Sequence, residues 1–163
     1  MPRLITALVL AWLGLSARRT EVAPGTQQFT LWQADLQVRS LTVSEENGNL
    51  RARVVVGAEV GEALGARVEV LLPVGVGIVT LGPGCRAGPN VTGIRELRAR
   101  VECSVGDLPS RSIRELFVVT TLPPGGVARG FAVVAMSDTP DPKPGNNFAE
   151  RVIPQDDRDP RLP

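Results

Sequence analysis

Four side chains with hard oxygen donors lie close together near the C-terminal end of the chain. They are Asp138, Asp141, Asn146 and Asn147, all within ten residues. Ca²⁺ takes about six to eight oxygen ligands, so one hypothesis for this segment is a calcium site. The other is a turn in which the Asp and Asn side chains hydrogen-bond their own backbone and the intervening prolines fix the path. Because no D-x-D-x-D-G spacing is present, the sequence favours the turn.

The chain contains two cysteines, Cys85 and Cys103. The 17 residues between them exclude C-x-x-C redox chemistry, and the sequence has no histidine to complete a zinc site. In an oxidising compartment such a pair is usually joined, so we predict a structural disulfide. Closing a loop of this size would stabilise the fold by roughly 3 kcal/mol.

Other residue types that could carry catalysis are scarce. Without histidine, Ser-His-Asp, Cys-His and His-metal arrangements cannot be built. The single lysine, Lys143, stands in a proline-rich loop rather than in an apolar segment that would make it a base. The carboxylate pairs at 45–46 and 156–157 read as solvated turn and tail residues, and no glycine-rich phosphate loop is present. We therefore expect no enzyme, no catalytic residue and no cofactor.

Composition restricts the partners and the core. Lys and Arg total 18 against 17 Asp and Glu, for a net charge of +1, so no long-range field would attract nucleic acid. The hydrophobic fraction is 43%, but aromatic residues make up only 4% and tyrosine is absent. Val and Ala are therefore expected to fill most of the core.

Apolar and polar residues alternate with a period of two through most of the chain, which is typical of half-buried strands. Two segments, 94–103 and 113–121, could also be amphipathic helices, but alternation and β-branched content favour strands. Gly and Pro mark turns at 62–65 and around Cys85. The expected strands are 36–43, 50–60, 68–72, 76–81, 96–103, 113–121, 131–136 and 148–153. This pattern predicts an all-β, antiparallel, immunoglobulin-like sandwich of about seven to eight strands.

The N-terminus predicts export. A short positive segment ending at Arg3 precedes the apolar run 4–15, which is too short to span a bilayer. We interpret residues 1–17 as a signal peptide, with an uncleaved membrane anchor or a buried helix as the alternatives. Residues 18–33 are expected to be a linker or N-terminal arm, 34–153 the sandwich and 154–163 a disordered tail.

The segment 101–147 carries a family pattern, V-x-C-x-x-G-x-L followed by S-x-x-x-D-P-x-P-x-N-N. Its positions are Val101, Cys103, Gly106, Leu108, Ser137, Asp141, Pro142, Pro144, Asn146 and Asn147. Together with residues 34–36 and 71–79, this pattern resembles the bacterial surface-protein repeat domain catalogued as the eleventh domain of unknown function. The resemblance implies an immunoglobulin-like sandwich in exported or wall-associated proteins, serving as a spacer, structural or adhesive module without catalytic residues.

The chain departs from this family in two respects. Residues 60–66 replace the family's N-x-G-P-x-x-A segment, and the sequence holds one copy without a recognisable wall-sorting signal. We expect a non-enzymatic, exported module of the cell envelope that binds a protein or a surface polymer. The alternatives are a secreted carbohydrate- or protein-binding domain, and a fibre or surface-layer subunit that self-associates by strand exchange through residues 18–33.

Overall fold

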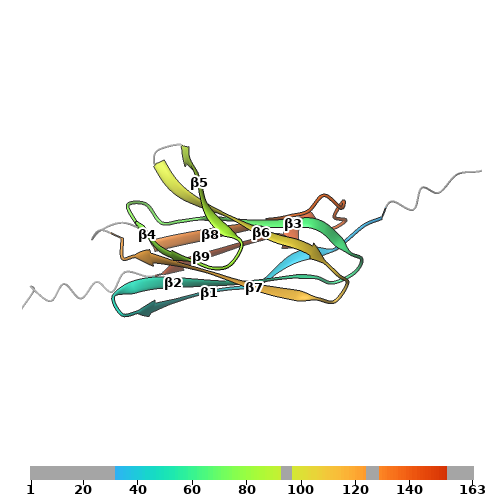
Figure 1. The fold of residues 1–163 in the computed structure, drawn as a ribbon, viewed down its shortest axis with the longest axis horizontal. Helices are drawn as coiled ribbons and strands as arrows, with labels where there is room; N and C mark the ends of the chain where they lie inside the picture. The colour runs from blue at the N-terminus through green and yellow to red at the C-terminus, as the bar shows by residue number, and fades with distance from the viewer. Residues whose placement is uncertain (1–31, 93–96, 124–128, 154–163) are drawn as a thin grey trace, which may run out of the picture. The chain divides into compact units, whose positions relative to one another are not determined.

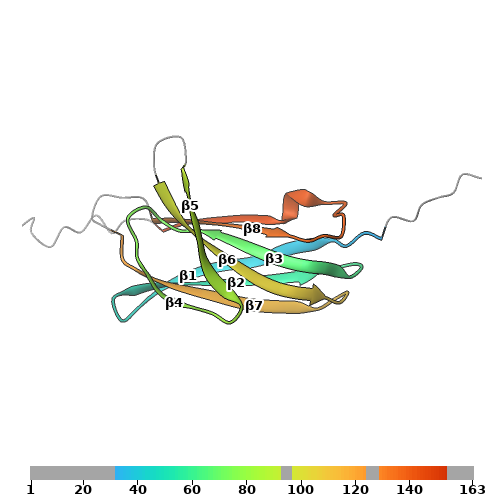
Figure 2. The same cartoon turned by 45° about the horizontal axis from the view of Figure 1, so that its top comes forward.

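A computed structural model describes residues 32–92, 97–123 and 129–153. In these ranges the chain forms strands β1 (Leu36–Glu46), β2 (Asn49–Ala58), β3 (Ala63–Leu71), β4 (Ile78–Leu81), β5 (Cys85–Thr92), β6 (Leu97–Leu108), β7 (Ile113–Thr121), β8 (Arg129–Met136) and β9 (Phe148–Ile153), and the 3-10 turn η1 (Pro144–Asn146). One sheet has the order β1-β2-β7-β4 and the other β5-β6-β3-β8-β9, with every pairing antiparallel. Figures 1 and 2 show the two layers facing each other. The predicted all-β sandwich is confirmed.

The strands follow the period of two in the sequence. In β2, Leu50, Ala52 and Val54 are buried, whereas Arg51 and Arg53 point to the outer face, where they contact β7 side chains. The same alternation places Val68 and Val70 of β3 inside the sandwich. Alternate residues of each sheet therefore meet in a single core.

The core consists mainly of small aliphatic side chains, as the composition predicts. The largest fully buried side chains are one Phe, four Leu and seven Val: Phe131, Leu36, Leu50, Leu72, Leu108, Val54, Val56, Val68, Val70, Val101, Val118 and Val133. Their burial supplies most of the stabilisation, at about 25 cal/mol per Å² of apolar surface.

Two expected turns are strands instead. The segment around Cys85 forms β5, which pairs with β6 through a register shift between Gly88 and Val91. Pro89 lies inside that irregularity at the sheet edge, where a missing N–H removes no ladder bond. Residues 63–65 are also strand, with irregular pairing up to Ala66 and with Gly65 at φ +57°.

The first and last strands run in the same direction. β1 begins where Leu36 pairs with Ala58, β9 begins directly after η1, and the two strands contact each other. The beginning of β1 and the end of β9 therefore lie at opposite ends of the sandwich, as Figure 1 shows. The predicted signal peptide (1–17), all of the predicted arm except Trp32 and Gln33, and the tail (154–163) lie outside the described residues.

Candidate functional site

The loop that joins β8 to β9 packs against the beginning of β1. The Ala34 N–H donates to the Pro140 carbonyl at 3.1 Å, and the Leu36 N–H donates to Asp141 Oδ2 at 2.9 Å. We call these two segments, 34–36 and 137–147, the clasp. It joins residues more than 100 positions apart in the sequence.

Asp35 lies at the centre of the clasp and is only 5% exposed. Its Oδ2 accepts a hydrogen bond from Lys143 Nζ at 2.9 Å, and its Oδ1 accepts one from Asn146 Nδ2 at 2.7 Å. The hydrogen bond from Lys143, followed by that from Asn146, lowers the pKa of Asp35 below its usual value. The hydrogen bond to Asp35 correspondingly raises the pKa of Lys143. Both groups are therefore held in their charged forms at neutral pH.

Asp141 organises the loop itself. Its Oδ1 accepts from the Lys143 N–H at 2.7 Å, an Asx-type turn, while its Oδ2 accepts from Leu36 N–H and from Asn147 Nδ2. Prolines on both sides restrict the backbone and reduce the entropy lost on ordering. One carboxylate thus fixes both the turn and its contact with β1.

The other side of the loop is attached to the beginning of β3. Thr139 Oγ1 accepts from the Leu64 N–H at 3.0 Å and donates to the Glu62 carbonyl at 3.1 Å. Asp138 pairs with Arg67 at 3.1 Å on the surface. The clasp therefore connects β1, β3 and β9 at one end of the sandwich.

The four residues of the calcium hypothesis are divided among these contacts. Asp141 and Asn147 are hydrogen-bonded to each other, Asn146 binds Asp35, and Asp138 binds Arg67. Asp138, Asp141 and Asn147 line a cavity of about 260 Å³, and the Oδ1 atoms of Asn146 and Asn147 are buried without a protein partner. Among the described residues, no group of three or more His, Cys, Asp or Glu could hold a metal ion. The calcium hypothesis stays a prediction.

A second concave region lies between β3, β5 and β6. It has a volume of about 510 Å³ and includes Arg67, Glu69, Arg86, Glu102 and Ser104 among its lining residues. Glu102 pairs with Arg86 at 2.9 Å and with Arg100 at 2.7 Å, and Arg100 also reaches Glu69. Sequence reasoning did not identify this region, although the charged residues alternating along β3 and β6 are its signal. Its charges largely neutralise one another.

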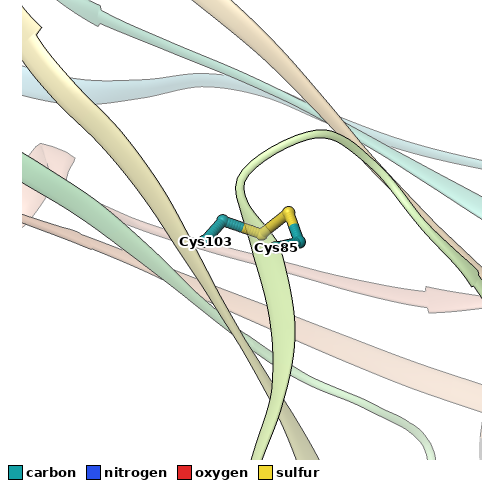
Figure 3. The surroundings of a disulfide bond; sticks show 2 residues. All are labelled: Cys85 and Cys103. Carbon is teal, nitrogen blue, oxygen red and sulfur yellow. A yellow bond between two sulfur atoms is a disulfide. The ribbon is translucent and has the colours of Figure 1, made fainter.

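The predicted disulfide is confirmed. Cys85 and Cys103 are direct partners in the β5–β6 ladder, with their Cα atoms 3.9 Å apart. Figure 3 shows the bond bridging the two adjacent strands. Because β5 pairs only with β6 in the described part of the sheet, the disulfide attaches an edge strand to its neighbour.

Sequence reasoning identified the 138–147 loop as a turn or a calcium site, and residues 34–36 only through the family pattern. It did not assign Asp35 a role, and it considered Lys143 only as a possible base. The structure instead gives the carboxylates of Asp35 and Asp141 donors from the chain itself. This arrangement is suited to holding segments together.

Comparisons with known proteins find no matching family model and no matching curated protein. In the described ranges we find no helix with the length and apolarity needed to cross a bilayer.

Proposed function

We propose that this chain is a non-enzymatic, exported structural module of the bacterial cell envelope. It acts as a spacer that separates the segments attached to its two ends along the direction of its strands. The observation that carries the proposal is the position of the strand ends. The chain enters β1 at the clasp end of the sandwich and leaves β9 at the opposite end (Figure 1). A domain with this path can be inserted between two other segments and separates them by the length of its strands.

Two further features support the export and envelope parts of the proposal. The Cys85–Cys103 disulfide is a feature of oxidising compartments, and the 1–17 segment has the pattern of a signal peptide. The clasp residues Asp35, Asp141, Asn146 and Asn147 also belong to the segments that resemble the bacterial surface-protein repeat domain. Their hydrogen bonds support a structural role for that pattern.

The test is fractionation of bacteria that produce the chain with an epitope tag after Pro163. We expect the tagged chain in the envelope or the medium, with residues 1–17 removed and the disulfide closed. Mass spectrometry of the purified chain, with thiol alkylation before and after reduction, measures both properties. A cytoplasmic chain with an intact N-terminus and two free thiols would contradict the proposal.

One observation favours a binding domain as a second candidate function. Trp32 is 90% exposed beside the clasp end, and Val60, which is 63% exposed, lies in the loop that pairs with Asp35. Exposed aromatic residues are common in carbohydrate- and protein-binding surfaces. Trp32→Ala should abolish retention on an immobilised cell-wall polysaccharide if this candidate is correct, whereas the structural module does not require Trp32.

A further inference from the structure

We propose that the clasp is a mechanical lock that holds β1 and β9 together when the chain is pulled from its two ends. The proposal rests on the proposed function, because a module placed in line between two attachments transmits the tension applied to either of them. It adds that a small set of polar contacts at one end of the sandwich determines the resistance.

The direction of the strands determines how tension acts. A pull on the chain before Ala34 draws β1 toward its own first residue, and a pull after Ile153 draws β9 toward its own last residue. Because β1 and β9 run in the same direction and contact each other, these two forces slide one strand past the other. The ladders that hold them, from Leu36↔Ala58 to Glu46↔Asn49 and from Val134↔Phe148 to Arg129↔Ile153, are loaded along the strands. Many bonds must then break together, unlike in peeling, where they break one at a time.

The clasp opposes this sliding directly. Its contacts join the residues that precede or begin β1 to the loop that leads into β9. Asp35 binds Lys143 and Asn146, and Leu36 binds Asp141. Asn147, the residue before β9, is attached to Asp141 and accepts a bond from the Ala135 N–H at 2.8 Å. The force that enters at β1 and leaves at β9 therefore passes through these hydrogen bonds.

The burial of Asp35 makes the lock resistant to solvent. A surface ion pair breaks easily because water replaces each partner, and such pairs are worth about 0–1 kcal/mol. The Lys143 side chain is 70% exposed, but Asp35 is only 5% exposed and accepts a second hydrogen bond from Asn146, so solvent reaches this pair mainly from the lysine side. Hydrogen bonds to a buried charged group are stronger than average. When one partner is lost, the buried charge is left without a compensating donor.

The test is single-molecule force spectroscopy on the full chain, with handles on its two termini and the disulfide kept oxidised. Asp35→Asn should raise the unfolding rate at constant force by roughly tenfold, the factor that corresponds to the loss of a hydrogen bond to a charged group. Val118→Ala is the matched control, because Val118 is a fully buried core residue of β7 outside the clasp. For the same loss of equilibrium stability, it should raise the rate under force less than Asp35→Asn.

A second pulling geometry separates a lock from ordinary stability. A handle on Glu46→Cys, paired with one on the C-terminus, pulls on the ends of β1 and β9 that lie away from the clasp. Asp35→Asn should have a clearly smaller effect there than in end-to-end pulling. Equal effects in the two geometries, or an effect no larger than that of Val118→Ala, would overturn the proposal. These outcomes are independent of fractionation, which tests where the module resides and not how it resists force.

Discussion

Among the described residues, Asp35 is the only buried carboxylate, and this makes the clasp sensitive to acid. Its pKa in the folded chain is lowered from 3.8, chiefly by the hydrogen bond from Lys143. Because the pKa of Asp35 is lower in the folded than in the unfolded chain, its full stabilisation is present at pH values above the unfolded pKa. This stabilisation is lost as the pH falls through the folded pKa. We expect Asp35→Asn to lower the free energy of unfolding by about 2 kcal/mol at pH 7, with the deficit shrinking below about pH 4.

Urea unfolding of both chains across this pH range measures the difference. Asp138→Asn is the matched control, because Asp138 pairs with Arg67 at the surface of the same loop. It should cost less than about 1 kcal/mol. A deficit for Asp35→Asn that stays constant down to the lowest pH would contradict the role of its charge.

Calcium provides a second test at the residue scale. Each carboxylate of the clasp already accepts hydrogen bonds from the chain, so a metal ion would have to displace them. We expect no rise in Tm when millimolar CaCl₂ replaces the same ionic strength of NaCl. A bound ion at a hundred times its Kd would add about 2.7 kcal/mol, so a clear rise that Asp141→Asn abolishes would establish the calcium site.

Gly61 shows how closely the chain approaches the beginning of β1. Gly61 has φ +74°, and a Cβ there would lie 2.0 Å from the Gln33 carbonyl oxygen. Gly106 has φ +77° but nothing within 4 Å of the same position. Both alanine variants incur the left-handed strain, but only Gly61→Ala adds overlap with backbone. Thermal unfolding should show Gly61→Ala to be less stable than Gly106→Ala by about 1–3 kcal/mol, and equal stabilities would exclude the close approach.

At the scale of elements, β5 depends most on a covalent bond. In the described sheet it pairs only with β6, and the register shift interrupts that pairing. Opening the disulfide in the Cys85→Ala/Cys103→Ala variant should cost roughly 3 kcal/mol in denaturant unfolding. Hydrogen exchange should accelerate first in 85–92, while the β2–β7 ladder stays protected. Equal acceleration of exchange in β5 and in the β2–β7 ladder would mean that β5 does not open separately.

The same strand marks the limit of what periodicity reveals. β2 and most of β3 were predicted because their apolar residues alternate with charged ones, and β7 was predicted from its β-branched content. In β5, Gly88 and Pro89 break the alternation, so propensity indicates a turn. The strand forms because β6 provides a long partner and the disulfide fixes the register. Neither influence is visible within a short window of sequence.

At the scale of the whole molecule, strand exchange through the N-terminal arm can be tested by deletion. The proposed module completes its sandwich with residues from 34 onward. Removal of residues 18–33 from the proposed mature chain should therefore not change its oligomeric state, as measured by size-exclusion chromatography. If the deletion converts an oligomer into a monomer, the arm acts as a donor strand and the fibre-subunit alternative is favoured.

The candidate site was only half predictable. The pattern near the C-terminus identified Asp141, Asn146 and Asn147, and turn chemistry gave the correct local role of Asp141, which accepts from the Lys143 N–H. The side chains of Asn146 and Asn147 instead donate to carboxylates, those of Asp35 and Asp141. The partner of Asn146, Asp35, lies 111 residues away, and its burial results from the packing of β1 against the loop. No local rule connects residues at that distance. The contact follows only from the topology that places the first and last strands side by side.

That distance also determines when the molecule can become stable. A chain that crosses a membrane from its N-terminus presents Asp35 first and the residues that satisfy it almost last, 108 positions later at Lys143. Until then, the carboxylate stays hydrated and β1 gains nothing from the clasp, since long-range contacts form only after the intervening chain is available. In the exported chain proposed above, the clasp can therefore form only after nearly all of the sandwich has emerged from the membrane.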